Sequence, residues 1–342
     1  MVSNEVAKKG WLKSLKDIFK ANPAFLFCLI LFVSVVASIF ILAAIFPDYE
    51  VLYPDALDLP PSTEHVLGTT HMGRDNLVSL LNGAKNSLII GFGTAGISVP
   101  LAIIIGTLSG YKGGKLDNVL STLTNVFLVL PTTSLFMIIA VTVGAQSLEI
   151  VIVLIGALIW PWAARSIRSQ VMSLKEREFV NLARITPTGA SLKYKFFTVL
   201  TGVCFGILIW SFFAGFIGDL YSILLGVLVG FLFIIALWSL HGRIAFTELL
   251  PNMLSYIILV FAMEVVIGVG IEASLSIIGV SQPGRITLGR MLYEALNWSQ
   301  AVVKGYYWLW VPPGLILLLI VMVIYILQAS MPQIFNPRLR EK

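Results

Sequence analysis

The chain has 342 residues, of which 58% are hydrophobic and only 12% are charged, and its formal net charge is +5. Soluble domains are about 45–50% apolar and ~25% charged, so this composition excludes a soluble enzyme, a nucleic-acid-binding protein and a disordered chain. A membrane span needs ~20 apolar residues, and the sequence contains about eight such runs. We therefore expect an all-α polytopic protein of the cell membrane, with the lipid bilayer and no nucleic acid as a partner.

The first part of the chain sets the expected orientation. Residues 1–22 are rich in lysine, with apolar residues at helical spacing, which predicts an amphipathic segment on the cytoplasmic membrane surface. A first transmembrane span follows at 23–46. The loop 47–86 carries six acidic residues against two basic ones. Because basic loops stay in the cytoplasm, the N-terminus is expected inside and this loop outside.

Later apolar runs continue this pattern. Spans are expected at about 87–109, 119–143, 148–164, 196–217, 221–240, 254–280 and 308–328. Counting the spans places the basic stretch 165–195 and the basic C-terminal tail in the cytoplasm. The run 119–143 contains Pro131. A proline inside a span frees a backbone carbonyl group, and neighbouring hydroxyl groups can satisfy it. Only the loop 281–307, outside by this count, carries more basic than acidic residues and opposes the topology.

No motif predicts catalysis or metal binding. The sequence lacks the G-x-x-x-x-G-K-[ST] phosphate loop, H-E-x-x-H and G-x-S-x-G, and its histidines and cysteines do not have metal-ligand spacing. Glu264 and Glu272 are the acids inside a long apolar run. Eight residues apart, they lie about 80° apart around a helix and form a poor catalytic pair. We expect no catalytic residue, no metal and no cofactor in this chain.

Several motifs occur in a recognisable order. EREFVNLARITPTGAS (176–191), with RIAFTELLPN (243–252), resembles the cytoplasmic coupling loop of binding-protein-dependent ABC importer permeases. GTTHMGRDNLVSLLNGAKNSLIIG (68–91), EASLSIIGV (272–280) and NPRLR (336–340) resemble stretches of the dipeptide/oligopeptide branch of that family. The order also matches, so the chain resembles the C-type permease subunit of this branch.

The resemblance implies a six-span permease core that pairs with a paralogous B-type subunit. It also implies two cytoplasmic ABC ATPases that bind ATP and Mg, an extracellular substrate-binding protein, and short peptides as cargo. The chain itself would be non-catalytic. By the resemblance, the residues that contact the ATPases are Glu176, Arg177, Glu178, Ala183, Arg184, Gly189, Ala190, Ser191, Leu250 and Pro251.

Two further groups of residues match the family. The outer loop carries the signature residues Gly68, Gly73, Arg74 and Asp75, although the pattern is interrupted near His71. This motif forms either a structural lid or a contact with the binding protein. Glu272 matches a family position and is expected to make a structural or gating hydrogen bond, whereas Glu264 is expected to line the aqueous path or face the paralogue.

One segment departs from the family. About 48 residues, roughly 195–242, stand between the two halves of the coupling loop 165–252 and interrupt the permease core 87–342. They comprise two apolar runs with Asp219 between them. We expect an accessory transmembrane hairpin, which gives about eight transmembrane helices in total; a buried cytoplasmic hairpin is the alternative, but it would expose a large apolar patch.

Other functions remain open from the residues alone. An ABC importer of the same type could instead carry oligosaccharides. Aromatic residues such as Tyr306 and Trp308 would suit the binding of sugars, although aromatic residues are also common at membrane interfaces. A nickel importer has only His65 and His71 to support it. A membrane-embedded enzyme lacks a catalytic motif, and a secondary transporter should show internal repeats, which are not evident.

Overall fold

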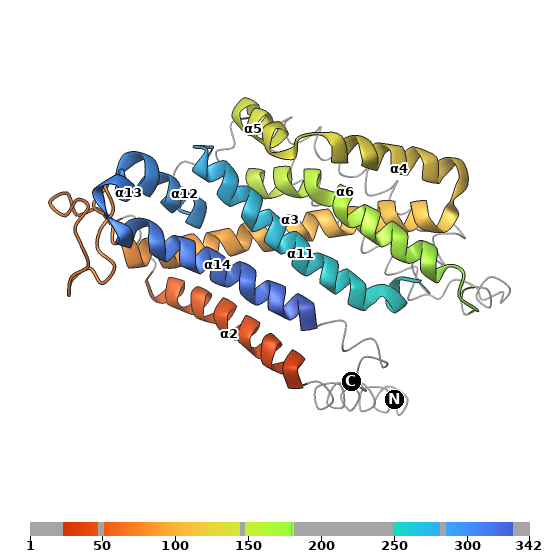
Figure 1. Cartoon of the computed structure of the whole chain (residues 1–342), viewed down its shortest axis with the longest axis horizontal. Helices are drawn as coiled ribbons and strands as arrows, with labels where there is room; N and C mark the ends of the chain where they lie inside the picture. The colour runs from red at the N-terminus through yellow and green to blue at the C-terminus, as the bar shows by residue number, and fades with distance from the viewer. Residues whose placement is uncertain are drawn as a thin grey trace, which may run out of the picture. The chain divides into compact units, whose positions relative to one another are not determined.

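A computed structural model describes residues 23–46, 51–143, 148–178, 180, 249–280 and 285–330. The secondary structure in this part of the chain is helical, apart from an isolated bridge between Thr69 and Asp75. The chain divides into two compact units, Met1–Gly91 with Val265–Lys342 and Phe92–Glu264. The helices α3 and α11, both labelled in Figure 1, contribute a part to each unit.

The first unit is built on two long apolar helices, α2 (Pro23–Ile45) and α14 (Tyr307–Ser330). They pack against each other, and Figure 1 shows them side by side. Of the 23 residues of α2, only Phe25, Cys28, Ile39 and Ala43 are buried. Such a helix exposes too much apolar surface for water and is suited to lipid. The short helices α12 (Leu288–Tyr293) and α13 (Ala301–Lys304), with the π-helical turn η2 (Glu294–Trp298), pack near the start of α14.

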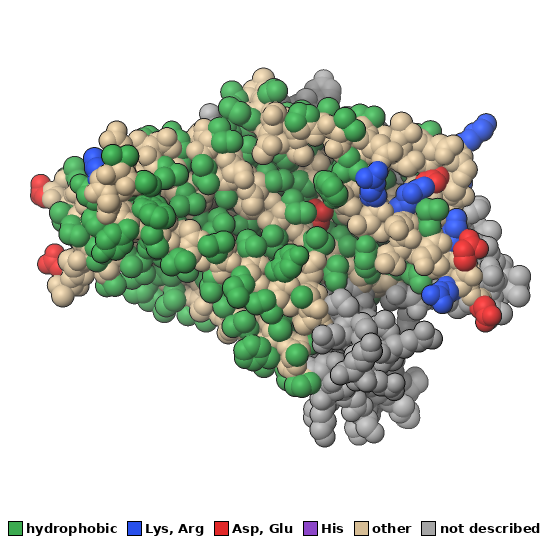
Figure 2. Space-filling view, viewed as in Figure 1, with side chains coloured by type: hydrophobic (Ala, Val, Ile, Leu, Met, Phe, Trp, Pro, Cys, Tyr) green, Lys and Arg blue, Asp and Glu red, His purple; other side chains and the backbone are tan. Residues whose placement is uncertain are grey.

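The second unit contains α4 (Gly114–Val129), α5 (Thr132–Val143) and α6 (Leu148–Leu174), with parts of α3 (Asn76–Lys112) and α11 (Leu250–Ile277). Both α4 and α5 pack against α6. A buried cluster from α3, α6 and α11 forms the core of this unit. Figure 2 shows apolar side chains over most of the visible face and Lys and Arg gathered over the ends of α4 and α6.

The expected all-α polytopic architecture is confirmed. Five described helices are long and apolar enough to cross a membrane, and the pair α4 and α5 adds a sixth if it is one span. The spans expected at 23–46 and 308–328 agree closely with α2 and α14. The basic segment 1–22 and the two runs within 195–242 lie outside the described residues, as does the C-terminal tail from 331.

Three features of the described helices differ from the expected spans. The run 119–143 is not one straight span: α4 and α5 meet at an angle of 82° around Pro131. Leu130 is extended, with ψ of 135°, because a residue before proline avoids the helical region. In addition, α3 begins at Asn76, inside the stretch assigned to the outer loop, and α6 continues through Arg165 to Leu174.

Candidate functional site

The outer-loop motif forms a tight turn that leads directly into α3. Gly68 and Gly73 have φ of 69° and 71°, which side chains rarely adopt. A Cβ atom at Gly68 would collide with the carbonyl oxygen of Leu59, and one at Gly73 with that of Tyr53. Both glycines are therefore required by the close approach of two backbone segments.

Asp75 acts as the N-cap of α3. Its Oδ1 accepts hydrogen bonds from the backbone N–H groups of Leu77 at 2.9 Å and Val78 at 3.1 Å, which have no partner inside the helix. Its Oδ2 accepts a hydrogen bond from Nδ1 of His65 at 2.8 Å. Arg74 is half-buried, and its backbone N–H donates to Thr70 Oγ1 at 3.2 Å. In this geometry the motif residues hold the loop on the helix.

A stripe of buried amides on α3 was missed by the sequence reasoning. Nδ2 of Asn76 donates to the carbonyl oxygen of Trp308 at 2.5 Å, that of Asn82 to Phe46 at 2.9 Å, and that of Asn86 to Ile286 at 2.7 Å. These asparagines tie α3 to the ends of three other segments of the first unit. The spacing held only part of the signal: Asn82 and Asn86, four residues apart, share one face of the helix, whereas Asn76 lies about 120° from Asn82 around it.

Glu272 is buried, with 3% of its surface exposed, and hydroxyl groups surround it. Its carboxylate accepts hydrogen bonds from Ser276 at 2.8 Å, Thr287 at 2.6 Å and Ser87 at 3.4 Å. The Ser87 hydroxyl in turn accepts the backbone N–H of Leu288 at 3.1 Å. Three donors therefore satisfy a carboxyl group that would otherwise be costly in a membrane span, and they join α3, α11 and the start of α12.

Glu264 has a simpler environment in the second unit. It is 2% exposed, and its Oε2 accepts a hydrogen bond from the Ser98 hydroxyl at 2.7 Å. The two in-span acids thus have separate hydroxyl partners. Around neither acid do the described residues place a nucleophile against a base, the arrangement that nucleophilic catalysis needs.

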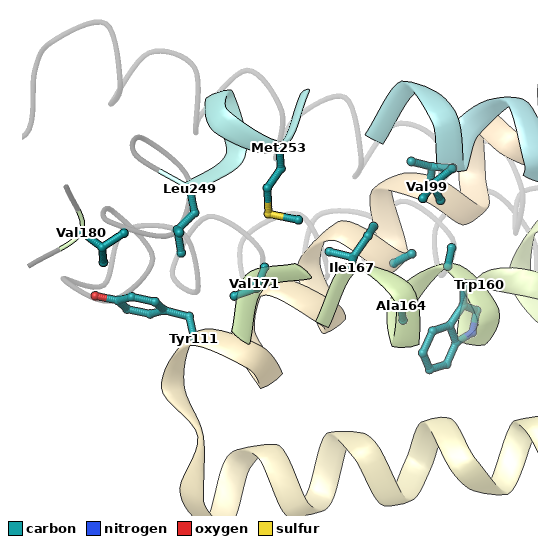
Figure 3. Packing of buried hydrophobic residues seen from close by; sticks show 12 residues of the cluster. Val99, Tyr111, Trp160, Ala164, Ile167, Val171, Val180, Leu249 and Met253 are labelled. Atoms are coloured by element: carbon teal, nitrogen blue, oxygen red, sulfur yellow. The ribbon is translucent and has the colours of Figure 1, made fainter. Parts of the chain in front are cut away.

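The beginning of the expected coupling loop follows α6. Glu176, Arg177 and Glu178 are exposed, and the next described residue, Val180, is completely buried. Figure 3 shows Val180 in one cluster with Val171 of α6, Tyr111 of α3, and Leu249 and Met253, which precede and begin α11. Val180, two residues after Glu178, therefore anchors the charged turn Glu176–Glu178 on this core cluster.

Other expected coupling residues could not be placed. Ala183, Arg184, Gly189, Ala190 and Ser191 lie outside the described residues. Leu250 and Pro251 form the first turn of α11. Because Leu249 and Val180 belong to the same cluster, the structure nevertheless brings together the two points at which the chain leaves and re-enters the described core.

An ion pair neutralises one of the basic residues in the loop 281–307, whose excess of positive charge opposed the expected topology. Arg290 lies in the outer loop 281–307, where an excess of basic residues opposed the assignment. Its Nε donates to Oε1 of Glu294 at 2.8 Å, within the same helical stretch. The pair is largely buried, with side-chain exposures of 14% and 4%. Because Glu294 neutralises its charge, Arg290 is weak evidence for which side of the membrane the loop faces.

The comparisons with known proteins agree with the motif order. The family described as "Binding-protein-dependent transport system inner membrane component" matches residues 99–240. The oligopeptide transport system permease protein OppC of Mycobacterium tuberculosis is 37% identical over 158 residues, which cover 46% of this chain and 53% of that protein. OppC of Lactococcus lactis subsp. cremoris is 22% identical over 329 residues, 95% of this chain and 94% of that protein.

A third relative differs in its named cargo. The nickel transport system permease protein NikC of Escherichia coli is 34% identical over 143 residues, 40% of this chain and 50% of that protein. The alignments at 34–37% identity thus span about half the length of these relatives. Together with the apolar helices and the motif order, they show that the chain is a multi-pass membrane protein similar to the ABC importer permeases, and in particular to their C-type oligopeptide subunits.

Proposed function

We propose that this chain is one of two membrane subunits of an ATP-driven importer of short peptides, and that it forms the translocation path with a paralogous B-type subunit. The observation that carries the proposal is the similarity to an oligopeptide permease over 95% of the chain. In this proposal a soluble binding protein delivers the peptide outside, both termini are cytoplasmic, and two cytoplasmic ATPases bind ATP and Mg.

The turn Glu176–Glu178 is proposed to contact an ATPase. It offers charges of both signs to a protein partner, and all three side chains are exposed. Val180 fixes this turn to the core cluster that also contains residues of α6 and α11. Because packed cores transmit displacement rather than absorb it, movement of the ATPases would reach these helices through Val180.

Reconstitution tests the importer directly. The purified chain alone should not hydrolyse ATP, because its sequence has no phosphate loop. With its paralogue, two ATPases and the binding protein in liposomes, it should support hydrolysis that increases when peptide is added. ATP turnover by the chain alone, with contaminating ATPases excluded, would contradict the proposal.

Two substitutions test the coupling loop. Glu178→Ala should lower peptide-stimulated hydrolysis while assembly with the paralogue is unchanged, because the side chain is exposed and supports no described packing. Glu64→Ala removes an equally exposed carboxylate from the outer loop and serves as the matched control. Gly189→Leu should act like Glu178→Ala, since it adds bulk where the family has its loop glycine. A Glu178→Ala complex that couples like the parent would refute the assigned contact.

The identity of the transported substrate is tested separately from the importer function. Co-purification from native membranes, followed by mass spectrometry of the bound ligand, should recover short peptides with the binding protein. Recovery of an oligosaccharide or of nickel, as the name of one relative suggests for that protein, would replace the cargo. The importer assignment would then rest on the ATPase measurements alone.

A further inference from the structure

A polar pocket of about 210 Å³ lies in the second unit between the end of α3, α4 and α6. Polar and charged side chains contribute much of its lining: Ser109, Ser121, Thr124, Asn125, Arg165 and Arg168. Among the described residues, no carboxylate lines it. A pocket lined by two guanidinium groups and several hydroxyl groups is suited to an anionic ligand, because guanidinium groups form strong charge-assisted hydrogen bonds with oxyanions.

One of the two arginines is held in place by an acid behind it. Arg168 makes a bidentate ion pair with Asp117, in which Nε and Nη2 each lie 2.7 Å from a carboxylate oxygen. The Ser109 hydroxyl donates to the same carboxylate at 2.5 Å. The pair fixes the plane of the guanidinium group, and Nη1 remains available for a further acceptor.

The other arginine supplies the net charge. Arg165 is exposed and forms no salt bridge with any described carboxylate. Its Nη2 donates to Oδ1 of Asn125 at 3.1 Å, which leaves the amide NH₂ group of Asn125 as a donor. The pocket with Asp117 thus carries a net charge of +1, and its available donors suit an oxyanion such as phosphate.

The position of the pocket along α6 corresponds to a membrane interface. Arg165 is 17 residues from Leu148, where α6 begins, or about 26 Å at 1.5 Å per residue, close to the ~30 Å thickness of the hydrocarbon core. Trp162, one turn earlier on the same side of the helix, is 60% exposed. Exposed tryptophan is typical of the headgroup level.

We propose that this pocket binds the phosphate of an anionic phospholipid, in the leaflet on the side of the coupling loop. Arg165, Asn125 and the third nitrogen of Arg168 contact the phosphate oxygens, and Trp162 borders the glycerol region. The headgroup would then bridge α4 and α6, the helix that leads into Glu176–Glu178. Basic pockets between spans at the cytoplasmic side are known to favour acidic headgroups.

The test uses the purified full-length chain in a neutral detergent, together with its partner subunits. Phosphatidylglycerol, phosphatidylcholine with the same acyl chains, and sodium phosphate are titrated separately, and the melting temperature is recorded. Native mass spectrometry counts the lipids that stay bound. Phosphatidylglycerol should raise the melting temperature and be retained, whereas phosphatidylcholine should do neither.

The Arg165→Gln variant should raise the phosphatidylglycerol concentration for the half-maximal effect about five- to tenfold, because one charged contact is lost. Asn125→Ala should act in the same direction but less. Lys115→Gln removes an exposed charge from the start of α4 outside the pocket and should change the value less than about twofold.

Three results would overturn the proposal: an unchanged Arg165→Gln titration, an equal loss in Lys115→Gln, or a matching effect of sodium phosphate, which would identify a free anion as the ligand. The measurement requires neither peptide nor ATP, so its failure would leave the proposed importer function standing.

Discussion

Replacing Asp75 separates the two readings of the outer-loop motif. In Asp75→Ala, two backbone N–H groups at the start of α3 lose their acceptor, and His65 loses its partner at 2.8 Å. Loss of an N-cap costs about 0.5–2 kcal/mol. The pair with His65, whose two side chains are 12% and 20% exposed, adds about 0.2–1 kcal/mol. Together the unfolding free energy should fall by about 1–3 kcal/mol.

The assay is the melting temperature of the purified chain in detergent, with Asp75→Asn as the matched variant. Asparagine caps helices about as well as aspartate, so Asp75→Asn should lose only the added strength of the hydrogen bond that the His65 ring donates to a carboxylate. A loss of 1 kcal/mol lowers the melting temperature by about 2–4 °C in domains of 150–250 residues. Asp75→Ala should therefore melt several degrees lower, and Asp75→Asn about a degree lower. If Asp75→Ala melts like the parent but no longer responds to the binding protein, the cap is not its role and the motif is a contact surface.

Three further outcomes follow from other sites. Burial lowers the pKa of His71 from its ordinary value of 6.5. As the pH falls, the unfolded chain therefore takes up a proton on His71 at a higher pH than the folded chain does, and the stability of the fold decreases as the pH drops through 6.5. The melting temperatures of the parent and of His71→Gln should accordingly diverge between pH 8 and pH 5, and parallel curves would contradict this. Val180→Ala empties part of a fully buried site and should cost about 1–3 kcal/mol while also lowering peptide-stimulated hydrolysis, whereas full coupling would show that Val180 is not the anchor. In a background without Cys28 and Cys204, Asp219→Cys should react with an impermeant thiol reagent added from outside; labelling from the cytoplasmic side alone would exclude the proposed hairpin.

Sequence reasoning located the spans well where one physical property decides them. The helices α2 and α14 agree with the expected runs to within two residues at each end, because a continuous apolar stretch is flanked by polar residues. It misplaced the start of α3 by eleven residues. Asn76, Asn82 and Asn86 lower the local hydropathy, yet each is buried and its amide NH₂ group donates to a backbone carbonyl group. Hydropathy cannot register a partner supplied by another segment.

The candidate site shows the same division. The motifs identified Asp75 and Glu272, but not what each contacts. The partner Thr287 lies 15 residues from Glu272, and Ser87 lies 185 residues away. The ion pair of Asp117 with Arg168, 51 residues apart, carried no motif. Contacts between distant segments depend on how the helices pack, which the pattern of one segment does not contain.

The shared burial of Val180 and Leu249 has a consequence for how this chain tolerates change. The two residues are 69 positions apart, yet both are fully buried in one cluster, so the core holds both ends of the segment between them. The entropy cost of closing a flexible loop grows only with the logarithm of its length, about 0.6 kcal/mol for each doubling. Shortening the segment from 68 residues to 20, by the 48 residues at 195–242, spans less than two doublings, so the closure cost would change by only about 1 kcal/mol. Segments of different lengths can therefore connect Val180 to Leu249. A permease of this kind could gain or lose an accessory segment there without a change in the packing of the helices next to the turn Glu176–Glu178.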